Sequence, residues 1–203
     1  MHPGDLVISA DEKPSIQARD RVAETLPPTA GVPRGQRVEH TYKRRGALTY
    51  LAAWDVRRGG VIGRCEPKGG IEPFDRLVSQ VMTREPYASA RRVFWIVDNG
   101  SSHRGQRSID RLHGDWPNLV LVHTPVHASW LNQIEIYFSI VQRKVLTPND
   151  FTDLDQVQQR LADFEQLYNQ IAEPFDWNFT RDKMTAWLAR LTARQGHAAT
   201  AAA

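Results

Sequence analysis

Three acidic side chains occupy positions from which they could bind a metal ion together. Asp98 follows the apolar run Val93–Val97 and precedes Asn-Gly, so a buried strand gives way to a turn at this residue. Asp11 follows the apolar run Leu6–Ala10 in the same way, and Glu135 lies near the start of an amphipathic segment. Three carboxylates that meet repel one another unless cations are present, and oxygen-rich sites suit Mg²⁺ or Mn²⁺. Two such ions about 4 Å apart can activate an attacking oxygen and stabilise a leaving one in phosphodiester displacement.

Hydrophobic periodicity predicts the elements that must position these acids. The predicted strands are Leu6–Ala10, Ala47–Val56, Val61–Cys65, Val93–Val97 and Leu119–His123, and the predicted helices are Ile71–Arg84, Gln106–His113, Trp130–Leu146, Asp153–Ile171 and Thr180–Ala193. The early strands are joined by short turns, as in antiparallel pairs, whereas the later strands alternate with helices, as in parallel crossovers. The sequence therefore predicts an α/β fold, a mixed sheet with helices on both faces.

The expected strand order would bring the acids together. If the first strand is central and the fourth lies parallel beside it, Asp11 and Asp98 emerge at the same strand ends, where α/β sheets place their sites. Glu135 borders the apolar stripe of the predicted helix Trp130–Leu146, and an acid there needs a partner or a metal. Asn132, three residues earlier on the same side of that helix, is an auxiliary candidate that could orient a ligand or a water.

Each of these residues also has a simpler interpretation. Asp98 could only form a turn, because Asp-Asn-Gly favours turns. Asp11 could be a loop acid, and the neighbouring Glu12 could be the ligand instead, although Asp11 lies nearer the strand end. Glu135 could be a solvated helix residue. His103 is an auxiliary site candidate, or a loop histidine that binds the backbone.

Three segments carry a resemblance to a known family. In chain order, ISADEKPSIQARDR, VFWIVDNGSSHRG and HTPVHASWLNQIEIYFSIVQRKVL resemble the three catalytic blocks of DDE/D transposases, most closely the bacterial insertion-sequence branch of the mariner-like (Tc/mariner) superfamily. Thirty-six residues separate Asp98 from Glu135, as expected of the DDE form. The resemblance extends from Gly4 to about Met184.

The resemblance implies a fold, a site and an activity. It implies a ribonuclease-H-like domain with a five-stranded mixed sheet over residues 1–178, followed by a C-terminal helix and a frayed tail over 179–203. Asp11, Asp98 and Glu135 would be the catalytic triad and would bind two Mg²⁺ ions, for which Mn²⁺ could substitute. The implied activity is metal-dependent DNA cleavage at element ends and strand transfer, into a TA target, by a dimer assembled on DNA.

Charge distribution is compatible with a DNA partner. Residues 1–111 hold 19 Lys and Arg against 13 Asp and Glu, so the positive charge is concentrated in the first half of the chain. A Pro-rich basic arm is expected over residues 20–45. The predicted DNA contacts are Lys13, Arg37, Lys43, Arg44, Arg45, Arg104 and Arg107. The alternative for all of them is an exposed, solvated basic surface.

Composition narrows the class of protein. No apolar run in the 203 residues approaches the ~18 that cross a membrane, and the start of the chain lacks a signal-peptide pattern. The single Cys65 excludes internal disulfides and CxxC zinc sites, and it fits a reducing cytosol. These features lead us to expect a cytoplasmic protein, and the resemblance implies a bacterial one, bound to the nucleoid when it engages DNA.

The expected organisation leaves two other functions open. Full-length relatives carry an N-terminal helix-turn-helix region that reads the element ends, and this chain starts at the first catalytic strand. It would then be either a catalytic half that works with a separately encoded helix-turn-helix half, or a truncated non-catalytic remnant that keeps the fold and binds DNA or partner subunits. A third hypothesis is a host nuclease of similar fold that acts on RNA–DNA hybrids.

Overall fold

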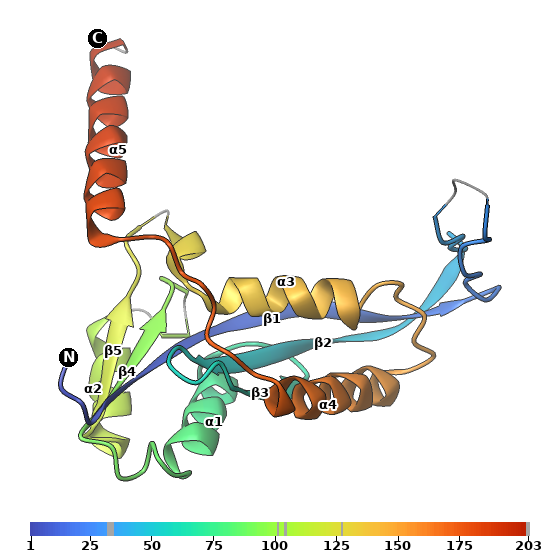
Figure 1. Cartoon of the computed structure of the whole chain (residues 1–203), viewed down its shortest axis with the longest axis horizontal. Helices are drawn as coiled ribbons and strands as arrows, with labels where there is room; N and C mark the ends of the chain where they lie inside the picture. Colours follow the sequence, from blue (N-terminus) through green and yellow to red (C-terminus); the bar gives the residue numbers. More distant parts are fainter. Residues whose placement is uncertain (32–34, 101, 104, 127, 202–203) are drawn as a thin grey trace.

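A computed structural model describes residues 1–31, 35–100, 102–103, 105–126 and 128–201 (Figure 1). In this part of the chain the elements are, in order, β1 (Asp5–Arg21), β2 (Tyr42–Asp55), β3 (Val61–Glu66), α1 (Ile71–Met82), β4 (Arg92–Val97), α2 (Gln106–Asp115), β5 (Leu119–His123), the 3-10 turn η1 (Ser129–Leu131), α3 (Ile134–Lys144), α4 (Leu154–Gln170) and α5 (Arg181–Ala201). None of the helices in these ranges has the length and apolar character needed to cross a membrane.

The sheet has the strand order β3-β2-β1-β4-β5. β1 pairs antiparallel with β2, and β2 pairs antiparallel with β3, as the short turns between them predict. β1 pairs parallel with β4, and β4 pairs parallel with β5. The predictions of a mixed sheet, a central first strand and a parallel fourth strand beside it are therefore confirmed.

Alternation along β2 explains why both faces of the sheet need a helical layer. Leu51 and Ala53 are buried in a cluster with α1 and α2, whereas Tyr50 and Trp54 are buried in a second cluster with α3 and α4. Successive side chains of a strand point to opposite faces, so a strand that is apolar at every position must be covered on both. The predicted helices on both faces are confirmed.

The first strand is much longer than the predicted segment Leu6–Ala10, and that boundary was wrong. β1 continues past Pro14 to Arg21 and pairs with β2 as far as Tyr42. The register shifts between Lys13 and the residues that follow Pro14, which is how a strand accommodates a proline that has no N–H to donate. Only the two ends of the predicted arm belong to these strands, residues 20–21 to β1 and 42–45 to β2, and the two-stranded ribbon that they continue extends beyond the helices (Figure 1).

Two helix boundaries also differ from the prediction. The expected helix Trp130–Leu146 is interrupted: η1 ends at Leu131, Asn132 is extended (φ −75°, ψ 106°), and α3 begins only at Ile134. The last helix, expected to end at Ala193 before a frayed tail, runs to Ala201 and stands away from the sheet (Figure 1). Alanine is the strongest helix former, which explains why the Ala-rich end continues the helix.

Replacement of Ile16 tests whether β1 continues past Pro14. Ile16 is buried in the cluster with α3 and α4, so Ile16→Ala should lower the free energy of unfolding by about 2–5 kcal/mol in chemical denaturation. Val22 lies just beyond the strand and is 70% exposed, so Val22→Ala should change stability by less than ~0.5 kcal/mol. If β1 ended at Ala10, both substitutions would be nearly neutral.

Candidate active site

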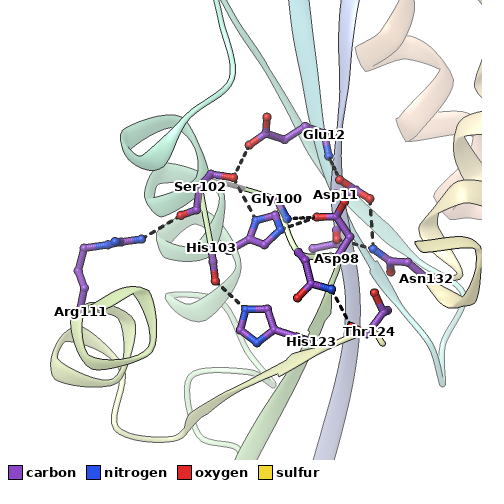
Figure 2. Close-up of polar contacts among 12 residues, drawn as sticks. Asp11, Glu12, Asp98, Gly100, Ser102, His103, Arg111, His123, Thr124 and Asn132 are labelled. Atoms are coloured by element: carbon purple, nitrogen blue, oxygen red, sulfur yellow. Dashed lines mark hydrogen bonds and ion pairs between the residues drawn. The ribbon is translucent and has the colours of Figure 1, made fainter. Parts of the chain in front are cut away.

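Parallel pairing places two of the predicted acids side by side. The last paired residues of β1 and β4 are Ser9 and Ile96, and Asp11 and Asp98 each follow two residues later. Figure 2 shows their carboxyl groups next to one another. Asp98 directly follows the end of β4, as expected, whereas Asp11 does not end its strand but lies within β1 opposite Ala52.

The Asp98 carboxylate is oriented by its own loop. Its Oδ1 accepts a hydrogen bond from the backbone N–H of Gly100 (2.7 Å) and another from Nε2 of His103 (2.7 Å). The other ring nitrogen of His103 is hydrogen-bonded to Ser102 Oγ (3.1 Å), and the residue is 1% exposed. A Cβ atom on Gly100 would lie 2.9 Å from Asp98 Oδ1, so this close approach requires glycine. His103, the predicted auxiliary residue, therefore contacts Asp98 directly.

The end of β5 and the residue that follows it support the Asp98 loop through two hydrogen bonds. His123 Nε2 donates to the backbone carbonyl of His103 (2.7 Å; Figure 2), and Asn99 Nδ2 donates to the carbonyl of Thr124 (2.8 Å). These bonds tie the Asp98 loop to the neighbouring parallel strand. His127, which also follows β5, lies outside the described residues.

Among the acids of the site, Asp11 has the pKa that is raised most. Its Oδ1 accepts from the backbone N–H of Glu12 (2.7 Å), and its Oδ2 accepts from Nδ2 of Asn132 (3.3 Å). Burial raises the pKa of Asp11 to about 7, and the negative charges of Asp98, Glu135 and Glu12 contribute to the rise. The structure thus brings Asp98 and Glu135 close enough to Asp11 for their charges to oppose its ionisation.

Glu135 is brought toward Asp11 and Asp98 by α3, which covers the face of the sheet opposite α1 and α2. It lies in the first turn of α3 and is solvent-exposed, yet partial burial of its carboxyl group and the charge of Asp98 raise its pKa, while the charge of Lys13 lowers it. Asn132 is fully buried just before α3, and its Nδ2 also donates to the carbonyl of Ala10 (2.9 Å). Asn132 was predicted to orient a ligand from a helix face, but it lies outside the helix and binds Asp11.

Glu12, the alternative ligand to Asp11, points elsewhere. Its Oε1 accepts a hydrogen bond from Ser102 Oγ (3.0 Å), on the His103 side of the loop (Figure 2). Neighbouring residues of a strand face opposite sides of a sheet, so Asp11 and Glu12 cannot both turn toward α3. This geometry favours Asp11 as the residue that faces Glu135.

The predicted basic contacts fall into separate groups. Lys13 is close to Glu135 and lines a groove of about 320 Å³ between β1 and the connection from α3 to α4. Lys43, Arg44 and Arg45 lie on the exposed distal part of β2, where Arg45 pairs with Asp20 (2.7 Å). Arg37, in the arm, and Arg107, near the start of α2, are both exposed, and Arg104 lies outside the described residues. Of the predicted basic contacts that the structure describes, only Lys13 lies beside the three acids.

The groove also contains residues that sequence reasoning missed. Gln17 and Arg19 line it together with Lys13, and the guanidinium of Arg19 lies over the ring of Tyr42 at 4.9 Å. They were missed because the predicted first strand ended at Ala10. The alternation of polar Gln17 and Arg19 with apolar neighbours was the strand signal that could have found them.

Carboxylate oxygens are the ligands that a hard divalent cation prefers, although the side chains of the site do not converge around a single point. Among the described residues, no three acidic, histidine or cysteine side chains converge tightly enough, as they stand, to hold a metal ion. The carboxylates of Asp11, Asp98 and Glu135 nevertheless supply only oxygen ligands, and the negative charges of Asp98 and Glu135 add to the rise in the pKa of Asp11 that burial causes. A cation at this position would remove that repulsion.

The chain belongs to the DDE superfamily endonuclease family, whose model matches residues 17–158. The matched segment contains Asp98 and Glu135, while Asp11 precedes it. No curated protein matches the chain.

Solved transposase structures share the fold. The Mos1 mariner paired end complex with Mn is 16% identical with a TM-score of 0.56, over 79% of this chain and 48% of that one. The Mos1 transposase paired-end complex with left transposon end is 16% identical (TM-score 0.52; 79% and 47% covered), as is a pre-cleavage Mos1 transpososome (0.54; 81% and 51%). The fold is therefore ribonuclease-H-like, as expected, and the chain spans about half the length of these Mos1 chains.

The raised pKa of Asp11 predicts a pH dependence in metal-free protein. Because the folded-state pKa is about 7 and the ordinary value is 3.8, the stabilising protonated form is lost as pH rises through about 7. In EDTA, the free energy of unfolding should fall between pH 5 and 7 by at most ~1.4 kcal/mol per pH unit. Asp11→Asn should remove most of this slope and leave the part due to Glu135, whereas Asp110→Asn, at an exposed acid, should retain all of it. Identical slopes in all three proteins would contradict the burial of Asp11 among like charges.

Proposed function

We propose that this chain is the catalytic domain of a DDE transposase, which cleaves DNA phosphodiester bonds and transfers the liberated strand ends during DNA transposition. The observation that carries the proposal is the meeting of Asp11 and Asp98 on adjacent parallel strands, with Glu135 brought to them by α3. Membership of the endonuclease family supports phosphodiester cleavage, and the fold shared with Mos1 transposase supports transposition as its context.

In this proposal the three acids hold two Mg²⁺ ions, or Mn²⁺ in their place. Asp11, Asp98 and Glu135 would hold the ions between them, since Asp11 and Asp98 are adjacent and α3 brings Glu135 to them. When bound, the ions would supply activation of the attacking oxygen and stabilisation of the leaving 3′ oxygen. The protein's own part is to orient the carboxylates: His103 and Gly100 hold Asp98, and the Asn132 amide holds Asp11.

DNA would approach along the groove beside the acids. Lys13, Gln17 and Arg19 provide cationic and amide donors for phosphate oxygens along a path that starts next to Glu135. The exposed basic residues Lys43 and Arg44 lie further along the ribbon that β1 and β2 form. They would contact DNA or a partner subunit.

The wider assembly is proposed from the family. Two element ends must be held together, so we propose a homodimer on DNA that acts on terminal repeats and target DNA, with helix-turn-helix recognition provided by a partner half. The bacterial insertion-sequence branch, and a location in the cytoplasm at the nucleoid, belong to the same proposal. Two of the solved Mos1 structures are paired-end complexes, one of them with the left transposon end, which supports DNA as the partner class.

Metal-dependent nicking tests the assignment of the triad. The substrate is a supercoiled plasmid that carries the genomic segments flanking the coding sequence, incubated with Mg²⁺ or Mn²⁺. Asp11→Asn, Asp98→Asn and Glu135→Gln should each reduce the nicking rate by at least about 10²-fold, because each removes a ligand charge. The matched control Glu12→Gln should keep most activity. Full activity of Asp98→Asn would falsify the mechanism, and a folded, DNA-binding but inactive wild type would favour the non-catalytic remnant.

Salt dependence of binding tests the groove. If Lys13 and Arg19 contact phosphates, Lys13→Ala and Arg19→Ala should each weaken binding of a duplex several-fold and reduce the slope of log affinity against log salt by about 0.9. Arg92 is exposed at the start of β4, away from the acids, and Arg92→Ala should leave the slope unchanged. Equal slopes for all variants would exclude the groove as the DNA path.

A further inference from the structure

A buried serine lies in β1, two residues before Asp11. Ser9 is the only polar residue in the apolar run that precedes Asp11, and it is 0% exposed. Burial of a hydroxyl group is unfavourable unless it is hydrogen-bonded, so its partners identify what it does. It pairs with Ile96 in the sheet, and its side chain faces the start of α3.

The Ser9 hydroxyl uses both its acceptor and its donor on the segment that carries Glu135. Ser9 Oγ accepts a hydrogen bond from the backbone N–H of Ile134 (2.8 Å) and donates one to Oδ1 of Asn132. The Asn132 amide then donates through Nδ2 to the carbonyl of Ala10 and to Oδ2 of Asp11. We call this set of bonds the Ser9–Asn132 junction.

The junction replaces the usual cap of the helix. The residue before α3, Gln133, makes no side-chain capping bond, so the N–H of Ile134 would otherwise be left without an acceptor at a buried position. Ser9 satisfies it from β1, 125 residues away in the chain. The first turn of α3 is therefore attached to β1 two residues before Asp11, and Glu135 is the next residue after the attached one.

We propose that Ser9 is a positioning residue of the active site: through the junction it sets the position of Glu135 relative to Asp11 and orients the Asp11 carboxylate. This inference rests on the proposed function, since it assigns Ser9 a part in that site. A role in stability alone would make Ser9 equivalent to any other buried hydroxyl. The alternative is thus testable by comparison with a hydroxyl that lies elsewhere in the core.

Tyr87 provides that comparison. Its hydroxyl is buried and donates to Asp55 (2.8 Å), and neither residue contacts the three acids. Tyr87→Phe therefore removes one buried hydroxyl bond without touching the junction. Asn132→Ala provides a second variant within the junction, because it leaves Ser9 to cap Ile134 while releasing Asp11.

The experiment measures Mn²⁺ affinity of the folded protein by calorimetry, and nicking at saturating Mn²⁺ and DNA. Ser9→Ala and Asn132→Ala should each weaken Mn²⁺ binding about tenfold and slow nicking at least tenfold, while Ser9→Thr, which keeps the hydroxyl, should recover most of both. Tyr87→Phe should lower the melting temperature as Ser9→Ala does but leave affinity and rate within about twofold.

Two outcomes separate the failure of this inference from that of the proposed function. If wild type binds Mn²⁺ and nicks DNA, and Ser9→Ala and Asn132→Ala behave like Tyr87→Phe, Ser9 has only a structural role and the inference is overturned. If Ser9→Ala does not fold, Asn132→Ala decides in the same way. If wild type neither binds Mn²⁺ nor nicks DNA, the proposed function is refuted, and the inference with it.

Discussion

The parallel pairing of β1 with β4 is the constraint on which the site depends. Its register is set by the core, because Ile8, Trp95 and Val97 must be buried in the cluster beneath α1 and α2. A shift of one residue would turn each of these side chains to the other face of the sheet. The same register places Asp11 and Asp98 two residues beyond the last pair. Apolar burial therefore determines where the two carboxylates meet, and no attraction between them is needed.

Bringing the carboxylates together is electrostatically unfavourable, and the surrounding residues hold them in place. Burial and three neighbouring acids raise the pKa of Asp11 to about 7, so in the metal-free protein this carboxyl group ionises only near neutral pH. Around the acids, fixed donors orient the carboxylates: the Gly100 N–H, His103 and the Asn132 amide. Such preorganisation is typical of sites built to hold cations and developing charge, since little reorganisation is then required at the moment of reaction.

The interruption before α3 shows how tertiary contacts override local preference. A continuous helix over Trp130–Leu146 would satisfy the apolar periodicity, but it would keep Asn132 on a helix face. The extended conformation of Asn132 instead lets its amide reach Ala10 and Asp11. The bonds to β1 replace those that the helix loses. Departures from local rules tend to occur at functional sites, and this one lies three residues before Glu135.

Much of the protein could be predicted from sequence alone. Periodicity identified five strands and their mixed pairing, and the position of Asp98 after a buried strand marked the site, because these features depend on local spacing and burial. The length of β1, the groove beside Lys13 and the partners of Ser9 and Asn132 were decided only by tertiary structure. Each depends on groups supplied from distant segments: β2 pairs with the residues around Pro14, and a β1 hydroxyl caps a helix 125 residues away. No local pattern records such bonds.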